Sequence, residues 1–412
     1  MRERVPIQGD NHGPGGKRLK QVLTGNEAAA IAAKLARVNV ISAYPITPQT
    51  AVVEKLSEFV ANGELDAEFV KVESEHSALS VCIGASSVGA RAFTATSSQG
   101  LMLMSEMLFV AAGLRLPIVV TNANRSLSAP LSIWCDQQDS FAVRDSGLVQ
   151  LYCENNQEIL DSVIQAYRVA EELLLPVMVC YDGYILSHTV EPIEVPEQVE
   201  IDKFLPPYKH PHPLDPNKPV TMGSVGVPEY YEEFRCMLQQ AMCAAEHKLV
   251  EVGREFGKRF GRRYGLLERY RSDDADVILL TAGSLSGSAK AFIDRYRKRG
   301  ERVGLVKLRA YRPFPGKKLV EALSGAKAVA ILEKDISLGW TGALFSDVSA
   351  AFINAKKSPL LLDFICGLGG RDVSPLQIRE AVRAAAKAAE TGEVKRPVRW
   401  LGLREKIVGL GM

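Results

Sequence analysis

The chain has 412 residues, of which 47% are hydrophobic and 24% are charged. This length exceeds that of one ordinary domain, so we expect two or three domains, each with its own apolar core. The 50 basic and 48 acidic residues leave a formal net charge of +2, which gives no reason to expect a nucleic acid or an anionic membrane as a partner. No stretch reaches the roughly 18 apolar residues of a membrane-spanning helix.

The cysteines and histidines indicate neither disulfides nor a metal site. The seven cysteines are odd in number and scattered along the chain, which is typical of reduced, buried thiols. No C-x-x-C pair occurs, so we expect neither an iron–sulfur cluster nor a structural zinc on this chain. His210 and His212 lie among prolines and are interpreted as part of a loop. With no apolar signal segment in residues 1–16, we expect a soluble cytoplasmic protein.

The N-terminal part alternates between helix and strand patterns. Residues 1–22 are expected to form a mobile, slightly basic arm. Helices are predicted at Glu27–Ala36, Gln49–Val60, Glu75–Val88, Leu101–Leu114 and Gln157–Leu173. Strands are predicted at Val38–Ala43, Phe69–Val72, Arg91–Thr94, Ile118–Thr121 and Val177–Tyr181. Alternation with short connections predicts a parallel sheet covered on both faces.

A break and a second α/β region follow. Nine prolines between residues 192 and 228 indicate a linker or an extended strap. A long, charged helix is predicted from Glu229 to about Arg263, bridging two domains or lying against a partner. Further strands are predicted at 275–282, 303–308, 328–332 and 360–364, with a helix at 288–298. The turn Gly283–Gly287 is interpreted as an ordinary strand-to-helix turn rather than an anion site, because no complete phosphate-binding motif is present.

Polar side chains stand at the ends of three predicted strands. Thr47 follows the first strand, Glu75 the second and Arg125 a later one. Open α/β sheets bind ligands at the carboxyl ends of their strands, so a hydroxyl, a carboxylate and a guanidinium are expected in one cleft. Ordinary structural roles are also open: Thr47 as a helix cap, Glu75 as a first-turn acid favoured by the helix dipole, and Arg125 on the surface. Glu73 has the same strand parity as Glu75 and could be confused with it.

An ordered set of motifs from about residue 23 to the C-terminus resembles the α subunit of pyruvate:ferredoxin oxidoreductase and its 2-oxoacid relatives. The motifs are Gly25-Asn26-Glu27-Ala28, Tyr44-Pro45-Ile46-Thr47-Pro48, Ser74-Glu75, Thr96-Ser97-Ser98-Gln99-Gly100, Arg144-Asp145-Ser146-Gly147, Asp182-Gly183-Tyr184, Tyr311-Arg312-Pro313-Phe314 and Gly367-Leu368-Gly369-Gly370. The resemblance implies a thiamine diphosphate-binding, pyrimidine-type domain over residues 23–195. It also implies a strap and long helix over 196–271 and a smaller domain like the transketolase C-terminal domain over 272–412. The Tyr311–Phe314 motif is expected to pack rather than to catalyse.

The same resemblance assigns roles at the strand ends. It implies that Glu75 contacts N1′ of the aminopyrimidine ring of thiamine diphosphate and activates the cofactor. It implies that Pro45 and Ile46 also border the cofactor. Thr47 and Arg125 would bind the carboxylate of the 2-oxoacid, for which an arginine fork supplies charge and two parallel hydrogen bonds.

One motif that such enzymes need is missing from this sequence. It contains no Gly-Asp-Gly, which together with a downstream asparagine holds magnesium and the diphosphate in thiamine enzymes. The resemblance therefore implies half an active site. A β subunit would supply the diphosphate side, Mg²⁺ and a 4Fe-4S cluster, with γ and ferredoxin-like δ subunits besides. Coenzyme A would accept the acyl group, and ferredoxin or a flavin/NAD subunit would accept the electrons.

Several alternatives stay open at this point. Trp134 and Cys135 depart from the Gly-Asp-His-x-Asp wording common in the pyruvate enzymes, so phenylglyoxylate or another 2-oxoacid could be the substrate. A non-oxidative thiamine enzyme half and a non-catalytic scaffold of the same fold are the remaining alternatives, because a fold alone does not establish function.

Overall fold

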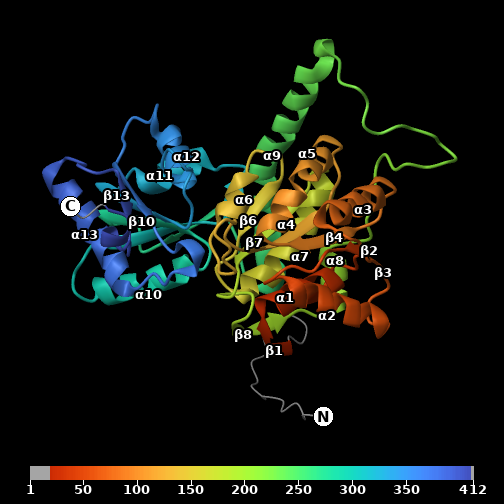
Figure 1. Cartoon of the computed structure of the whole chain (residues 1–412), viewed down its shortest axis with the longest axis horizontal. Coiled ribbons are helices and arrows are strands. Elements are labelled where there is room, and N and C mark those ends of the chain that lie inside the picture. Colours follow the sequence, from red (N-terminus) through yellow and green to blue (C-terminus); the bar gives the residue numbers. More distant parts are fainter. Residues whose placement is uncertain (1–18, 410–412) are drawn as a thin grey trace.

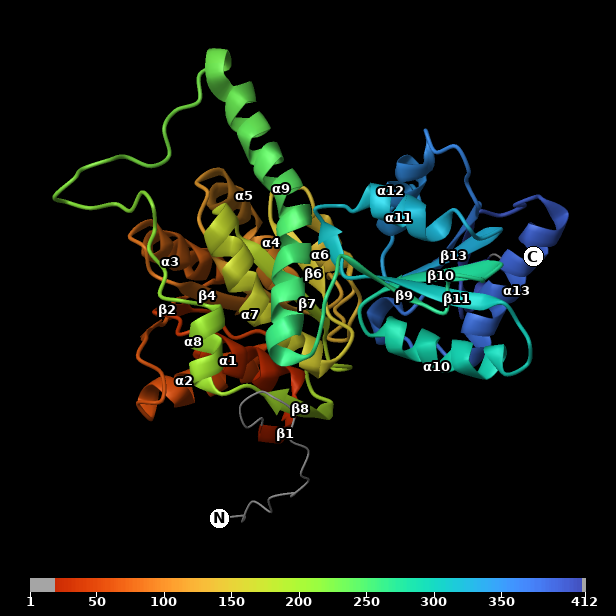
Figure 2. The same cartoon turned by 180° about the vertical axis from the view of Figure 1, so that it is seen from behind.

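The computed structural model describes residues 19–409, which form two α/β units lying side by side (Figures 1 and 2). The first unit runs from the N-terminal end to the long helix α9, and the second carries the C-terminal third of the chain. Among the described residues, no helix is both long enough and apolar enough to cross a membrane. Residues 1–18 of the expected N-terminal arm lie outside the described residues. The rest of that arm belongs to strand β1, Leu19–Thr24.

The first unit is built on a seven-stranded sheet in the order β12-β6-β7-β5-β4-β2-β3. Its strands are β2 Val40–Ser42, β3 Glu68–Val70, β4 Ala92–Thr96, β5 Val119–Asn124, β6 Val149–Tyr152, β7 Val177–Asp182 and β12 Ala310–Arg312. All neighbours pair in parallel except β12, which is antiparallel to β6. Every residue of β4, β5, β6 and β7 is buried, as expected for strands covered on both faces.

Two groups of helices pack on this sheet. The helices are α1 Gly25–Leu35, α2 Thr50–Ala61, α3 Glu75–Ser87, α4 Ser98–Leu103, α5 Ser105–Gly113, α6 Gln138–Ala142 and α7 Asn156–Leu173. Helices α1, α2 and α7 form one group, and α3, α4 and α5 form the other. The helix predicted over 101–114 is in fact two helices, because the chain leaves helical geometry at Met104. Below them, β1 pairs antiparallel with β8 (Val190–Val195).

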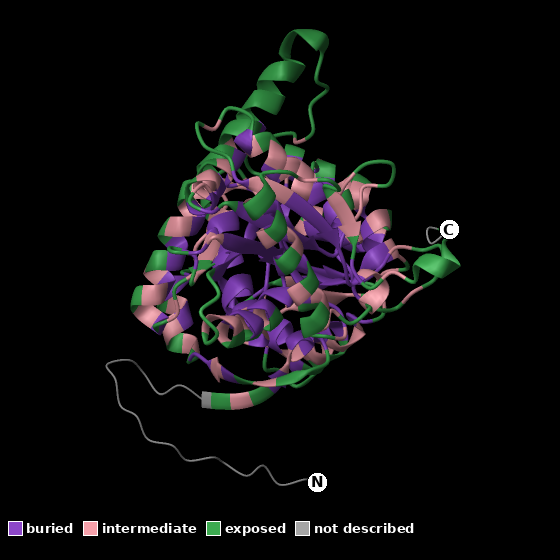
Figure 3. Ribbon diagram, turned by 90° about the vertical axis from the view of Figure 1, so that its left-hand side faces the viewer, coloured by how far each residue is buried: buried purple, intermediate pink, exposed green. Residues whose placement is uncertain are grey.

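The proline-rich strap leads into a helix that is only partly supported. After α8 (Gln198–Phe204), residues 205–227 run as an extended segment, and α9 spans Pro228–Phe260. The C-terminal half of α9 packs against α7 of the first unit, whereas its N-terminal half projects beyond the body of the molecule (Figure 1). The projecting half and the adjoining loop are exposed (Figure 3).

The second unit holds a six-stranded sheet in the order β15-β14-β13-β10-β11-β9. Its strands are β9 Leu267–Tyr270, β10 Val277–Ala282, β11 Val303–Leu308, β13 Ala328–Glu333, β14 Leu360–Ile365 and β15 Val398–Trp400. Its helices are α10 Leu285–Arg297, α11 Gly316–Leu323, α12 Ala343–Phe352 and α13 Pro375–Thr391, with short 3-10 turns at Leu368–Gly370 and Glu405–Ile407. Only β9 is antiparallel to its neighbour, and it begins before the expected boundary at residue 272.

Strand β12 ties the two units together. It follows β11 of the second unit yet pairs with β6 of the first. Tyr311 is fully buried, its hydroxyl donates to Asp347 Oδ2 at 2.7 Å, and the Arg312 guanidinium lies 4.4 Å from the Tyr311 ring centre. The Tyr311–Phe314 motif therefore packs, as predicted. The predicted α/β class with a large and a smaller parallel sheet is confirmed.

Candidate active site

The turn after β2 is clamped in place by two other motifs. The Asn26 side chain donates to the carbonyl of Pro48 at 2.8 Å, and the Tyr181 hydroxyl donates to Asn26 Oδ1 at 2.9 Å. A Cβ at Gly183 would lie 2.8 Å from Pro48 Cγ, so only glycine fits there. The turn presents its own residues at the carboxyl edge of the sheet, with Tyr44, Pro45 and Thr47 exposed and Ile46 partly buried.

Thr47 does not cap the next helix. Helix α2 begins at Thr50, and its capping position, Gln49, makes no side-chain capping bond. The carbonyl of Thr47 instead accepts a hydrogen bond from Arg125 Nη1 at 2.8 Å. The structure thus brings together two of the residues that the strand ends predicted.

Arg125 is held by main-chain oxygens rather than by acids. It follows β5 and is 7% exposed; its Nε donates to the carbonyl of Ser132 at 3.2 Å, in addition to the Thr47 bond. Within residues 19–409, no carboxylate forms an ion pair with this guanidinium and no group accepts from its Nη2. A buried guanidinium without an anion is positioned to bind one.

Asp139 organises the same strand ends, and sequence reasoning did not single it out. Its fully buried carboxylate accepts hydrogen bonds from five donors: Ser98 N (3.0 Å), Asn122 Nδ2 (3.0 Å), Asn124 Nδ2 (2.7 Å), Arg125 N (3.2 Å) and Ser140 N (2.7 Å). Burial raises the pKa of Asp139 to about 6, although these donors oppose the shift. Because four of these donors lie at or just beyond the ends of β4 and β5, Asp139 fixes the backbone that carries Arg125. An acid between a glutamine and a serine gives no local signal for this role.

Glu75 is a buried carboxyl with no partner among the described side chains. It opens α3, which begins there because Ser74 Oγ accepts from Ser77 N at 3.3 Å. Glu75 is 6% exposed, and a Cβ added to Gly100 would lie 2.5 Å from its Oε1 and 2.5 Å from Thr96 Oγ1. Glycine at position 100 therefore leaves room for this carboxyl. Thr96 Oγ1 is itself buried and has no hydrogen-bond partner within residues 19–409.

Glu73 and Glu75 differ in their surroundings. Strand β3 ends at Val70, so strand parity no longer relates the two residues. Glu73 is exposed, and its hydrogen bond from the Ser77 hydroxyl lowers its pKa. Burial raises the pKa of Glu75, with a smaller opposing effect from its own backbone N–H. Of the two, Glu75 is therefore the buried carboxyl at this edge of the sheet.

A turn of the second unit covers one side of the site. The main-chain N–H of Gly370 donates to the carbonyl of Cys135 at 2.7 Å, and that of Gly369 donates to Asp136 Oδ2 at 3.1 Å. A Cβ at Gly370 would lie 2.4 Å from Trp134 Cβ, so the turn approaches the loop as closely as glycine allows. Cys135 is buried under this turn, whereas Trp134 is partly exposed and its ring meets Tyr184 edge-on at 4.8 Å.

A buried ion pair joins the two units beside this loop. Lys334 Nζ donates to Asp182 Oδ2 at 3.0 Å, and the main-chain N–H of Ser284 donates to the same oxygen at 3.1 Å. Burial alone would raise the pKa of Asp182, but Lys334 and Ser284 more than offset it and the pKa is lowered. The turn Gly283–Gly287 does hold an anion, and that anion is a carboxylate of this chain. It is thus a docking contact and not a ligand site.

Metal ligands are not grouped in the part of the chain that the structure describes, where no three His, Cys, Asp or Glu side chains could hold one ion. The strand ends offer instead a buried carboxyl with a raised pKa, a guanidinium edge and a hydroxyl without partners among residues 19–409, at Glu75, Arg125 and Thr96. This donor set suits an organic group with a basic nitrogen next to an anion.

Comparison with known families and proteins agrees with this geometry. Residues 31–254 match the family model "Pyruvate flavodoxin/ferredoxin oxidoreductase, thiamine diP-bdg", and residues 275–378 match "Pyruvate:ferredoxin oxidoreductase core domain II". Pyruvate synthase subunit PorA of Pyrococcus abyssi is 53% identical over 95% of this chain and 100% of its own length. PorA of Methanocaldococcus jannaschii is 52% identical over 93% of this chain and 98% of its own. Ketoisovalerate oxidoreductase subunit VorA of Pyrococcus horikoshii is 45% identical over 94% and 98%.

Solved structures share the fold. A 2-oxoglutarate:ferredoxin oxidoreductase from Magnetococcus marinus superposes with a TM-score of 0.70 and 22% identity, over 93% of this chain and 68% of that one. A split-gene transketolase superposes with a TM-score of 0.54 at 13% identity, over 89% of this chain and 98% of that one. The family models and the relatives that match nearly end to end show that the chain belongs to the pyruvate:ferredoxin oxidoreductase family, as an α subunit carrying the thiamine diphosphate-binding domain.

Proposed function

We propose that this chain supplies the pyrimidine side of the active site in a complex that oxidises pyruvate. The reaction joins the acyl group of the 2-oxoacid to coenzyme A, releases carbon dioxide and passes a pair of low-potential electrons to ferredoxin. The PorA relatives at 50–53% identity support pyruvate as the substrate. The observation that carries the proposal is the buried, unpaired carboxyl of Glu75 at the edge of the sheet where such folds bind ligands.

Glu75 fits the aminopyrimidine ring of thiamine diphosphate. When bound, that cofactor supplies the electron sink that lets a 2-oxoacid lose carbon dioxide. The raised pKa of Glu75 favours the protonated carboxyl, which could share its proton with a ring nitrogen. Gly100 leaves space beside the carboxyl, and the Thr96 hydroxyl offers a further hydrogen bond. Pro45 and Ile46, in the turn held by Asn26, would border the ring.

Arg125 and Thr47 would orient the substrate. The free edge of the Arg125 guanidinium can donate to a carboxylate while its Nη1 and Nε keep their main-chain bonds. The Thr47 side chain is on the exposed side of the same turn and can donate a second hydrogen bond. Holding the carboxylate at two points fixes the direction of the adjacent oxo carbon, which is the geometric part of catalysis.

The remaining half of the site is assigned to partner subunits. Because the sequence lacks Gly-Asp-Gly, a β subunit would hold the diphosphate, Mg²⁺ and a 4Fe-4S cluster. γ and δ subunits would complete the path to ferredoxin, or to NAD through a flavin subunit. The seven free cysteines, five of them buried, support a reducing, cytoplasmic location.

A branched-chain 2-oxoacid is the second candidate substrate. The VorA relatives at 45–46% identity support it, and the partly exposed Trp134 near Arg125 gives an apolar side chain that a longer substrate could contact. Phenylglyoxylate has less support. Cys135, one of the two loop residues that suggested it, is buried and is therefore not available to contact a substrate.

The test is dye reduction by the natively purified complex, with coenzyme A, across pyruvate, 2-oxoisovalerate, 2-oxoglutarate and phenylglyoxylate. We expect coenzyme A-dependent activity that is highest with pyruvate. A preference for 2-oxoisovalerate would replace the substrate but keep the reaction. Silence across the panel in a complex that contains thiamine diphosphate and iron–sulfur clusters would contradict the reaction. Full turnover by a Glu75→Gln complex would favour the scaffold alternative.

A further inference from the structure

A cavity of about 390 Å³ lies between helices α10 and α13 of the second unit. The buried side chains of Phe292 and Ile378 and the half-buried Val373 form its apolar floor, and its polar lining includes three arginines. A volume of this size and a mainly apolar lining are typical of sites that bind small organic molecules. Figures 1 and 2 show α13 on the side of the second unit that is turned away from the first.

This α10–α13 cavity is separate from the candidate active site. Its lining residues Ser288, Phe292 and Arg295 recur every three or four positions, so they share one side of α10. The opposite side of the helix faces the first unit, where Lys290 Nζ donates to Glu154 Oε2 at 2.7 Å. A ligand in the cavity would therefore bind on the far side of α10 from the unit that carries the candidate site residues.

The charges that line the cavity favour an anion. Arg295 and Arg299 approach it from α10, and Arg379 approaches it from α13. Within residues 19–409, none of these guanidiniums forms an ion pair or donates a hydrogen bond. Together with Asp372 they give the lining a net charge of +2, three positive charges against one negative. Because the arginine fork matches the oxygens of a phosphate, this set favours a polyphosphate over a monocarboxylate.

The rest of the lining calls for more than phosphates. The ring of Tyr296 stacks on Phe292 with the centroids 4.1 Å apart, and the Arg299 guanidinium lies 5.6 Å from the Tyr296 ring centre. The Asp372 carboxylate has no partner among the described residues and can accept from a sugar hydroxyl or an amino group. A nucleoside phosphate combines the features that this lining would bind, namely an anionic chain, a flat apolar base and hydrogen-bond donors.

One wall of the cavity is continuous with the turn that covers the candidate active site. Val373 lines the cavity, and a Cβ at Gly367 would lie 3.2 Å from Val373 Cγ2. Gly367 begins the turn whose Gly370 N–H donates to the carbonyl of Cys135 at 2.7 Å. A ligand that contacts Val373 and Asp372 therefore contacts the short segment that also forms this turn.

We propose that the α10–α13 cavity binds a nucleoside di- or triphosphate, and that its occupancy acts on the turn Gly367–Gly370. The three arginines hold the phosphates, the apolar floor takes the base, and Asp372 accepts from the sugar or the base. The effect on turnover rests on the proposed function of this chain, whereas the binding itself does not.

The first test is calorimetric titration of the natively purified complex with ADP, ATP, adenosine and inorganic pyrophosphate. We expect ADP and ATP to bind more tightly than adenosine or pyrophosphate, and their binding to weaken as salt is added. Arg379→Gln should weaken ADP binding by roughly 10-fold or more, because it removes a charge-assisted hydrogen bond. Arg396→Gln, an exposed position outside the lining, makes the same change of charge and should leave binding unchanged.

Three results would overturn the site. ADP could fail to bind, the two variants could weaken it equally, or pyrophosphate could bind as tightly as ADP, which would leave no role for the nucleoside. Circular dichroism checks that both variants keep their helices.

The second test measures dye reduction with and without ADP while pyruvate and coenzyme A are varied. Coenzyme A contains an ADP portion and is therefore a second source of the same chemistry. We expect ADP to change KM for pyruvate by about 5-fold or more in the wild type and not in Arg379→Gln, without competing with coenzyme A. Competition with coenzyme A would place ADP at the coenzyme A site and overturn the proposal. An unchanged KM would overturn the link to the turn, whereas failure of the proposed function would show as a complex that binds ADP but reduces no dye.

Discussion

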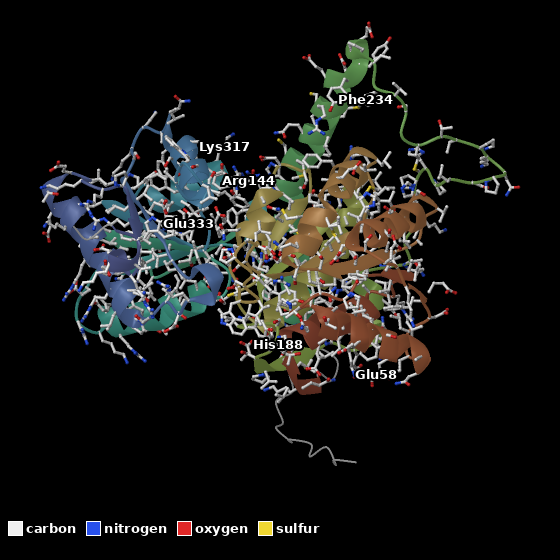
Figure 4. The ribbon with its side chains drawn as sticks, in the orientation of Figure 1. Glu58, Arg144, His188, Phe234, Lys317 and Glu333 are labelled. Carbon is white, nitrogen blue, oxygen red and sulfur yellow. The ribbon has the colours of Figure 1, made fainter. Side chains whose placement is uncertain are left out.

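The two sheets end in similar polar turns, and the candidate site lies at the turns of the first. In the second unit, buried acids at the strand ends all accept main-chain N–H groups at the start of α12. Leu344 N donates to Glu333 at 2.9 Å, Ala343 N to Asp335 at 3.1 Å and Gly342 N to Asp363 at 2.9 Å. Figure 4 shows Glu333 inside that unit. In the first unit, Glu75 accepts only from its own backbone N–H, and the outer edge of Arg125 has no acceptor among the described residues.

The comparison shows that a perturbed carboxyl is not by itself a functional one. Burial raises the pKa of Asp335 and Asp363 to about 6 and, reinforced by the nearby Asp363, raises that of Glu333 as well. Burial also raises the pKa of Glu75. What separates Glu75 is that no other described residue donates to its carboxyl, together with the space that Gly100 preserves. Polar groups that no other described residue hydrogen-bonds, rather than a shifted pKa, distinguish the candidate site.

The substitution with the largest expected effect, and the strongest test of the difference between the two sheets, is Glu75→Gln. The amide keeps the shape but cannot share a proton with a ring nitrogen, so we expect dye reduction to fall by about 10²- to 10⁴-fold. The complex should assemble normally. The measurement is the steady-state rate at saturating 2-oxoacid and coenzyme A, normalised to iron content.

Glu73→Gln is the matched control, two residues away. Glu73 is exposed and bonds only locally, so its variant should keep full activity. Equal losses in both variants would mean that the chemistry does not depend on the buried carboxyl, and the contrast between the two sheets would then have no functional meaning.

The second prediction concerns the contact between the units. Lys334→Met leaves Asp182 buried without its cation, which is expected to cost about 3–5 kcal/mol of unfolding free energy. The measurement is urea unfolding of the full chain. Replacing both partners, as in Asp182→Leu with Lys334→Met, should recover much of the loss. A single variant that costs under about 1 kcal/mol would show that the ion pair is not what holds the second unit against the site.

This contact also has a defined pH dependence. The pKa of Asp182 is lowered from its ordinary value of 3.8, so its native carboxylate is favoured. Its stabilisation is therefore fully present above that ordinary value and is lost as the pH falls through the lower, folded pKa. Comparing unfolding of the wild type and of the double variant between pH 3 and 7 isolates this contribution, which should vanish only at the acidic end.

The third prediction addresses Arg125. Arg125→Met removes the donor proposed for the substrate carboxylate, and charge-assisted hydrogen bonds contribute about 1.5–3 kcal/mol. We expect KM for the 2-oxoacid to rise by roughly 10- to 150-fold, with KM for coenzyme A unchanged. Arg125→Lys should recover part of this, because it keeps the charge without the fork. An unchanged KM for the 2-oxoacid would remove Arg125 from the substrate site.

The features that sequence predicted depend on local pattern. Buried strands and amphipathic helices have their own periodicity, so the α/β class followed from it. Thr47, Glu75 and Arg125 followed from their places after strands, and the structure puts Thr47 and Arg125 in contact. The substrate and cofactor roles of these residues stay predictions.

The features that sequence missed depend on residues far apart in the chain. Asp182 and Lys334 are 152 residues apart, and neither local sequence indicates an ion pair. Strand β12 joins the sheet of the other unit, which no periodicity can show. Asp139 looks like any loop acid until β4 and β5 direct their donors at it. Such contacts appear only once the topology is known.

The smallest expected effect allows a direct comparison of the two units, because each of them contains a helix that begins with a capping serine. Ser74 caps α3 at the site, and Ser374 caps α13 in the second unit by accepting from Gln377 N at 3.4 Å. Either serine replaced by alanine should lose about 0.5–2 kcal/mol of unfolding free energy. Only Ser74→Ala should also lower the turnover rate, by several-fold, because the first turn of α3 carries Glu75. Equal turnover rates in the two variants would show that capping α3 stabilises the fold without positioning the carboxyl.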